Sequence, residues 1–517
     1  MTNNTENNKR IAKNSLLLYF RMFLTMGVSL YTSRIILQTL GITDYGIYNV
    51  VGGVVAMFNF INGSLSGASS RFITYTLGEN NLNKLRTCFN TITFIHVFFA
   101  LIVFILAETI GLWFVIEKLT IPTERLNATI WAYQSTILTA IILLISSPFN
   151  ALIISHEKMG AFAYISIIEA LAKLLIVYAL YILPFDRLII YSILLIAVQC
   201  CIAFIYIIYC RRNFIESKFN ITQIDKQELY KIISYTSWTI NGSLAVIGYT
   251  QGLNIILNIF YGPAVNAARG IAVQVQGAVN NFFNNFLTAV KPQITKSYAQ
   301  KNYDYMHKLV ISSSKYSFFL SLFIALPLLY STEYILKIWL GIVPEYTSQF
   351  IKIMILVSMN YAIAYPTISA IHATGNIKKF QIVESSLLLL VIPVCYISVR
   401  IWNISPVCIF IIYLIIEIIT QFARVWIIYP QIDLPKRIYF KKILLPISIV
   451  CASVWIAPTL FQQTTSIQNE FIQFIILSIT CIISCIVCIY LFGLDKIEKQ
   501  FITNKIKHLP ILNKQSK

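Results

Sequence analysis

The chain has 517 residues, of which 57% are hydrophobic and only 12% are charged. Because soluble globular proteins are about 25% charged, this composition excludes an ordinary soluble domain and predicts a polytopic membrane protein. The net charge of +19 is collected in short segments between apolar runs, which indicates cytoplasmic loops and no nucleic-acid partner.

Apolar runs long enough to cross a bilayer recur along the whole chain. A membrane-spanning helix needs about 20 such residues, and on that criterion we predict an all-α fold with about 14 transmembrane helices. In chain order these are residues 15–39, 46–70, 87–112, 128–154, 160–182, 188–210, 231–260, 265–290, 309–331, 348–371, 380–400, 405–428, 442–461 and 471–492. The first run is too long for the apolar core of a cleavable signal, so it is predicted to be the first transmembrane helix.

The basic residues predict the orientation of these helices. With the N-terminus in the cytoplasm, the inside segments hold roughly 27 lysines and arginines and the outside segments roughly 5. An even number of helices then returns the basic C-terminal tail to the cytoplasm. Both termini are therefore predicted to be cytoplasmic.

A faint internal repeat predicts how the helices are grouped. The segment 34–81 recurs about 220 positions later, with Arg34 matching Asn254 and Asn59 matching Asn280. An even number of helices separates the copies, which is typical of a parallel repeat in a transporter. We predict two six-helix lobes, residues 1–225 and 226–440, followed by two C-terminal helices and a basic tail in 441–517.

Polar residues inside the apolar runs gather on single helix faces when helical periodicity is applied. The faces on the predicted second, seventh and eighth helices carry asparagine, glutamine and one arginine. Their members are Asn59 and Asn62; Gln251, Asn254 and Asn258; and Asn266, Arg269, Gln276, Asn280 and Asn284. A single asparagine is explained by a hydrogen bond between helices, but five polar residues on one helix predict the wall of a cavity.

Arginines inside the runs point to an anionic ligand. Arg21 and Arg269 each lie a turn or more inside a run, where an arginine costs about 2.5–3.5 kcal/mol. Arg71 lies near a cytoplasmic helix end and has two interpretations, an interfacial anchor or a cavity residue. Arg34 lies near Asp44, which is a possible partner.

Carboxylates within the runs are too few to neutralise these arginines. Glu169 and Lys173, four residues apart, are expected to pair, and so are Glu417 and Arg424. The remaining excess of arginine predicts a cationic cavity, and a guanidinium group suits phosphate oxygens especially well.

Two segments carry a family resemblance. The link between the first two predicted helices reads LGITDYGIYNVVGG (residues 40–53), and the link after the second reads GENNLNKLR (residues 78–86). Together with the helix count, the topology and the repeat, they resemble the polysaccharide flippases of the multidrug/oligosaccharidyl-lipid/polysaccharide exporter superfamily.

The resemblance implies a bacterial inner-membrane flippase for an undecaprenyl-diphosphate-linked oligosaccharide, used in O-antigen, capsule or exopolysaccharide biosynthesis. By helix and depth, Arg21, Arg34, Arg71 and Arg269 would hold the pyrophosphate. The sugar would contact Asn59, Asn62, Gln251, Asn254, Asn258, Gln276, Asn280 and Asn284. The partners expected are this lipid-linked substrate and the bilayer, with a polysaccharide polymerase complex as an option; no cofactor or metal is expected.

Two other functions remain open at this point. A multidrug or cation antiporter of the same superfamily predicts carboxylates in the N-terminal lobe, but the first two predicted helices contain none within the membrane. A membrane glycosyltransferase or polysaccharide polymerase predicts large extramembrane loops, whereas the longest outside loops hold about 15 residues. No glycine-rich phosphate loop is visible, so we expect a transporter and not an enzyme.

Overall fold

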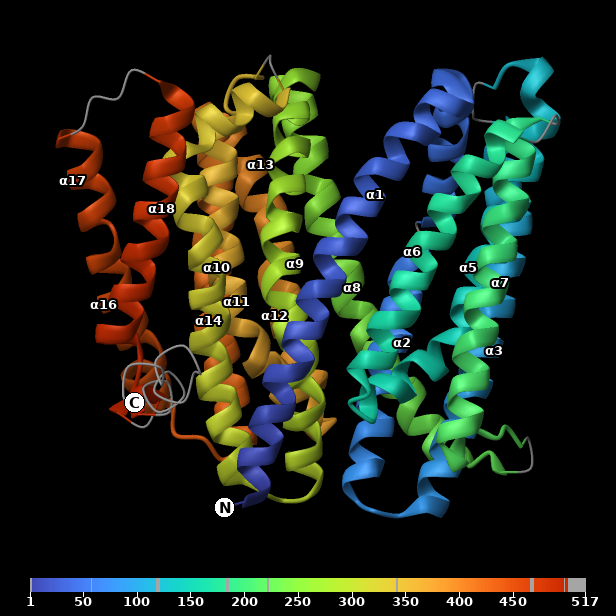
Figure 1. Cartoon of the computed structure of the whole chain (residues 1–517), viewed down its shortest axis with the longest axis horizontal. Helices are drawn as coiled ribbons and strands as arrows, with labels where there is room; N and C mark the ends of the chain where they lie inside the picture. The colour runs from blue at the N-terminus through green and yellow to red at the C-terminus, as the bar shows by residue number, and fades with distance from the viewer. Residues whose placement is uncertain are drawn as a thin grey trace, which may run out of the picture. The chain divides into compact units, whose positions relative to one another are not determined.

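The computed structural model describes residues 2–56, 58–117, 121–182, 186–220, 223–340, 343–464, 469–496 and 498–500. The described residues form helices and connecting turns, with no β-strand among them. The all-helical prediction is therefore confirmed (Figure 1).

Eleven helices in the described part of the chain are long and apolar enough to cross a membrane. The helices that hold the predicted spans 15–39, 46–70 and 265–290 are not among the eleven. These spans carry many of the polar residues singled out above, whereas Gln251, Asn254 and Asn258 lie in Lys226–Tyr261, which is among the eleven. The predicted count of 14 is not confirmed.

The chain divides into two compact units. The first consists of Met1–Leu244, Thr288–Met306 and His372–Ile382, and the second of Ala245–Leu287, His307–Ile371 and Val383–Lys517. Two segments from the second half of the sequence thus pack with the first unit. The predicted lobes 1–225 and 226–440 stay a prediction.

The first unit is built on seven helices from the first half of the chain. They are α1 (Thr2–Ala56), α2 (Asn59–Gly78), α3 (Leu82–Leu106), α4 (Leu112–Glu117), α5 (Leu126–Ser155), α6 (Met159–Ile182) and α7 (Arg187–Asn213). A π-helical turn at Ala107–Gly111 joins α3 to α4. Helix α5 packs against α7, and α1 packs against α6 (Figure 1).

The remaining helices begin with α8, which starts in the first unit and ends in the second. Their bounds are α8 (Lys226–Tyr261), α9 (Pro263–Ala299), α10 (Tyr303–Leu340), α11 (Thr347–Thr374), α12 (Lys378–Leu389), α13 (Val391–Trp402), α14 (Pro406–Gln431), α15 (Lys436–Ile438), α16 (Leu445–Val454), α17 (Ile456–Thr464) and α18 (Glu470–Cys488). Helix α10 is kinked at Ser331, four residues after Pro327.

The first two predicted helices have different boundaries in the structure. Helix α1 continues past residue 39 and bends at Gly41, which has a φ of 78°. Glycine adopts this left-handed region without a steric penalty, so the chain turns there without a separate loop. The predicted second helix, 46–70, is divided between the end of α1 at Ala56 and the start of α2 at Asn59.

A buried ion-pair network stabilises the interior of the second unit. The Arg424 guanidinium lies 2.8 Å from a Glu417 carboxylate oxygen and 2.7 Å from a Glu384 oxygen. The predicted pair of Glu417 and Arg424 is confirmed, and Glu384 of α12 is a second carboxylate on the same arginine. The Arg424 side chain is only 3% exposed.

Candidate functional site

A polar cavity of about 400 Å³ lies in the first unit beside α1, α6 and α7. Its wall is dominated by hydroxyl and charged side chains. It is lined by Arg21, Thr25, Val28, Ser29, Thr32, Ile36, Ser166, Glu169, Ala170, Lys173 and Tyr191. Arg21, which the sequence singled out inside the first apolar run, therefore does line a cavity, together with Thr25 and Thr32 of the same helix.

Arg21 brings a positive charge to this cavity, and no carboxylate among the described residues forms an ion pair with it. Its guanidinium lies 4.5 Å from the centre of the Phe162 ring, a cation–π contact that holds the group over the aromatic face. Within the described residues, the buried Nε of Arg21 donates no hydrogen bond, and the buried hydroxyl of Thr32 forms none. Buried polar groups are normally satisfied, so this wall is suited to a ligand that accepts hydrogen bonds.

The other two charges of the cavity neutralise each other. Lys173 Nζ lies 2.6 Å from the Glu169 carboxylate on the next turn of α6, as predicted from their spacing. With that pair neutral, Arg21 leaves the cavity with one net positive charge.

A second cavity of about 220 Å³ adjoins the first, because Tyr191 and Lys173 line both. Its other polar wall residues come from α5 and α7 and include Ser135, Thr136 and Gln199. The Ser135 hydroxyl is buried and has no hydrogen-bond partner among the described residues. Along these two cavities, the Arg21 guanidinium has no carboxylate partner among the described residues, and most of the other polar wall residues carry hydroxyl groups.

Sequence reasoning missed the contribution of α6 to this pocket. Ser166, Glu169, Ala170 and Lys173 are spaced at i, i+3, i+4 and i+7, so they share one face of the helix. This spacing is visible in the sequence.

Arg269 of α9 lies in the second unit and is 5% exposed. Its Nη1 donates to the Asn254 side-chain oxygen, and its Nη2 donates to the Thr250 carbonyl at 2.9 Å. Asn254 in turn donates to Gln251 at 2.9 Å. The structure thus brings three predicted site residues, Arg269, Asn254 and Gln251, into one network that contains no carboxylate.

The other predicted sugar-binding residues lie on three helices. Asn59 and Asn62 are on α2, Asn258 is on α8, and Gln276, Asn280 and Asn284 are on α9. The side-chain oxygens of Asn62 and Asn280 are buried without a partner among the described residues. A Cβ atom on Gly63, Gly67, Gly270 or Gly277 would meet nothing within 4 Å. The faces of α2 and α9 that carry these residues therefore border open space.

Arg71 of α2 is buried against the C-terminal end of α11 and does not line the cavity that contains Arg21. It donates to the carbonyl oxygens of His372 and Ala373, each at 3.1 Å, where α11 ends. A cation at a helix C-terminus satisfies carbonyls that lack helical partners. Gly375 allows this approach, because a Cβ there would lie 2.5 Å from Arg71 Nη2. These contacts hold the Arg71 guanidinium at the end of α11, and its predicted role toward the substrate stays a prediction.

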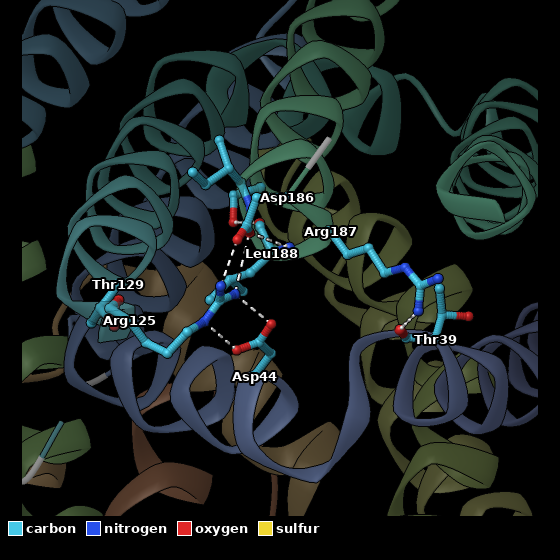
Figure 2. Close-up of polar contacts among 9 residues, drawn as sticks. Thr39, Asp44, Arg125, Thr129, Asp186, Arg187 and Leu188 are labelled. Atoms are coloured by element: carbon cyan, nitrogen blue, oxygen red, sulfur yellow. Dashed lines mark hydrogen bonds and ion pairs between the residues drawn. The ribbon is translucent and has the colours of Figure 1, made fainter. Parts of the chain in front are cut away.

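The side chain of Arg34 lies outside the described residues, so its predicted role stays a prediction. Its proposed partner Asp44 forms an ion pair with Arg125. Arg125 Nε donates to Asp44 at 2.8 Å, and Arg125 Nη2 donates to Asp186 at 3.2 Å (Figure 2).

This arginine-centred cluster joins α1, α5 and α7 at their predicted outer ends. Asp186 also accepts hydrogen bonds from the backbone amides of Leu188 and Ile189, and so caps α7. Burial alone raises the pKa of Asp186, but the hydrogen bonds from Arg125 and from these amides outweigh it and hold the pKa below its ordinary value. We call Asp44, Arg125 and Asp186 the outer cluster.

The outer cluster is expected to make the protein acid-sensitive. Because the pKa of Asp186 is depressed in the folded state, its stabilisation is complete above the ordinary value of 3.8 and is lost as pH falls through the lower folded value. The apparent melting temperature of the purified protein should therefore fall as the pH drops below about 4. Asp186→Asn should lower the melting temperature at neutral pH and flatten this acid dependence. An unchanged acid profile in that variant contradicts the assignment.

The chain matches a family described as "Polysaccharide biosynthesis protein" over residues 11–298, which is more than half of its length. No curated protein matches it. Among solved structures, it is similar to an outward-facing multidrug resistance MATE family transporter of the MOP superfamily. That match has a TM-score of 0.72 and 12% identity, and covers 83% of this chain and 96% of the other.

Two further structures have the same fold. A MOP superfamily transporter from Pyrococcus furiosus, described as having a binding pocket of reversed polarity, matches with a TM-score of 0.69 and 12% identity over 83% of this chain and 96% of the other. A MATE transporter of Vibrio cholerae matches with a TM-score of 0.66 and 16% identity over 83% of this chain and 98% of the other. The chain therefore belongs to the polysaccharide biosynthesis protein family and has the fold of the MATE transporters of the MOP superfamily.

Proposed function

We propose that this protein moves an undecaprenyl-diphosphate-linked oligosaccharide across the bacterial inner membrane by alternating access, for surface polysaccharide biosynthesis. Arg21 carries the proposal, because it lies in a polar cavity without a carboxylate partner within the described residues. A diphosphate would supply the negative charge and the acceptor oxygens that this guanidinium group lacks. Family membership supports a polysaccharide-related substrate.

The arginines with carboxylate partners strengthen this interpretation by contrast. Arg125 is neutralised by two aspartates and Arg424 by two glutamates. Arg21 and Arg269 have no such partner among the described residues, although both lie within predicted membrane helices. Because an unpaired cation in a membrane is costly, an anionic ligand at Arg21 would explain why this arginine is tolerated.

The hydroxyl groups around Arg21 suit the sugars next to the diphosphate. Thr25, Ser29 and Ser166 line the same cavity, and hydroxyl groups both donate and accept hydrogen bonds. Arg34, Asn59 and the asparagines of α9 remain part of the proposed substrate path. In this scheme the lipid tail stays in the bilayer while the charged headgroup crosses through the protein.

A multidrug or cation antiporter is the second candidate, because similar solved structures include a multidrug resistance transporter. Such a function needs free carboxylates, but those of the described first unit include several that are already paired. Glu169 binds Lys173, Asp44 binds Arg125 and Glu157 binds Arg10. The cavity with Arg21 therefore favours an anion over a cation.

Transport by the purified protein in vesicles tests the proposal. A lipid-linked oligosaccharide with a fluorescent sugar is placed in both leaflets, and a membrane-impermeant quencher reports the fraction that reaches the outside. We expect a diphosphate-linked lipid to flip about tenfold or more faster than a monophosphate-linked lipid with the same glycan, because each lost charged hydrogen bond costs about 1.5–3 kcal/mol. Equal rates contradict diphosphate recognition, and export of ethidium without lipid flipping favours the antiporter.

A further inference from the structure

Another polar cleft lies in the second unit, and its lining shares no residue with the two cavities of the first unit. Its volume is about 690 Å³, and it is formed by α10, α11, α16, α17 and α18. Small-molecule sites commonly occupy about 300–1,000 Å³, so the cleft has room for a short oligosaccharide. The orientation predicted from the basic residues places these helix ends on the outer side of the membrane.

Four aromatic rings stand in this cleft as two pairs. Tyr330 and Trp455 have ring centres 5.2 Å apart, and Tyr334 and Phe474 have ring centres 5.3 Å apart. The rings come from α10, from α18 and from Trp455, which lies between α16 and α17. Aromatic residues of an interfacial belt face the lipid headgroups, whereas these rings meet one another inside a cleft.

The breaks in two helices create the cleft. Helix α10 is kinked at Ser331, and Trp455 interrupts the helical run between Val454 and Ile456. The Tyr330 hydroxyl bonds to Thr459 at 2.6 Å and donates to the Trp455 carbonyl at 3.2 Å. These contacts fix the first aromatic pair, and 39% of the Trp455 surface remains exposed.

Charged and amide groups complete the wall, and their charges cancel. Glu333, Glu470, Lys337 and Lys352 all line the cleft, and Lys337 Nζ lies 3.1 Å from a Glu470 oxygen. Gln462 and Gln473 add groups that donate and accept hydrogen bonds. A neutral wall of this kind does not attract a phosphate, and its four charges exclude an acyl chain.

We infer that this cleft binds a neutral segment of an oligosaccharide on the outer side of the membrane. The apolar C–H face of a pyranose ring packs against an aromatic ring, while carboxylate and amide groups bond to its hydroxyl groups. The inference rests on the proposed function, because the glycan would belong to the lipid-linked substrate after it crosses.

The test uses the full-length purified protein and a free glycan. The probe is the oligosaccharide released by mild acid from lipid-linked intermediates of the host, and its binding is measured by calorimetry. We expect Trp455→Ala to weaken binding about tenfold, because an aromatic contact and its buried area are lost. Trp455→Phe should retain most of the affinity. Trp402→Ala is the matched control, since Trp402 ends α13, is 68% exposed and does not line the cleft.

Unchanged glycan binding by a Trp455→Ala variant that melts like a folded protein overturns the inference. If that variant does not fold, Gln473→Leu replaces it, and the same loss of binding is expected. Displacement of the glycan by glycerophosphoglycerol would identify a phospholipid headgroup site instead, and also overturns it. The vesicle assay separates this inference from the proposed function. Flipping by the wild type with no loss of glycan binding in Trp455→Ala refutes the cleft alone. Absence of flipping, with glycan binding that depends on Trp455, refutes the proposed function alone.

Discussion

Replacing Arg21 with alanine is expected to slow flipping of the lipid-linked oligosaccharide by about tenfold or more, because charged hydrogen bonds are worth about 1.5–3 kcal/mol each. The variant should remain as thermally stable as the wild type. Arg21 has no carboxylate partner within the described residues, so its removal leaves no buried charge unpaired. A loss of transport without a loss of stability is the signature of a ligand-binding residue.

Two further variants make the Arg21 experiment specific. Arg21→Lys keeps the charge but loses the planar donor geometry, so we expect an intermediate rate. Arg212→Ala is the matched control, because it removes one positive charge from an exposed position at the end of α7. Wild-type flipping by Arg21→Ala, or an equal loss in Arg212→Ala, contradicts a diphosphate site at Arg21.

Replacing Arg424 with methionine is expected to have the largest effect on stability. The substitution leaves Glu417 and Glu384 buried beside each other without their cation. Breaking a buried ion pair on one side costs about 3–5 kcal/mol. The apparent melting temperature of the purified protein should fall sharply, and the yield of folded protein should fall with it.

A compensated variant shows whether charge is the cause. Combining Arg424→Met with Glu417→Gln and Glu384→Gln removes the unpaired carboxylates, and we expect most of the lost stability to return. Failure of this triple variant to recover would assign the effect to packing around Arg424. An unchanged melting temperature in Arg424→Met alone would contradict the buried network.

Much of the fold could be predicted, because long apolar runs mark membrane helices directly. The predicted run 405–428 is α14, which begins at Pro406 and is capped by the Ser405 side chain. The predicted boundaries of the first two helices were wrong. A loop was predicted after residue 39, whereas α1 continues to Ala56 and only bends at Gly41, because a single left-handed glycine redirects the backbone without a loop.

The candidate site was predicted less completely, because periodicity places a residue on a face but does not name the neighbour. It put Arg21 on the face that lines the cavity. It did not show that Arg71 reaches carbonyls at the end of α11, or that Asp44 binds Arg125. Those partners are distant in sequence, and only tertiary packing brings them together.

The contact of Arg71 with His372 and Ala373 also affects when the first unit can finish folding during synthesis. Domains generally begin to fold as they emerge, with the N-terminal part first. The carbonyl acceptors of Arg71 belong to the end of α11, and the first compact unit includes residues up to Ile382. Arg71 therefore lacks these two carbonyl acceptors until most of the chain has been synthesised. A product that stops after α7 would lack part of the unit to which its own helices belong.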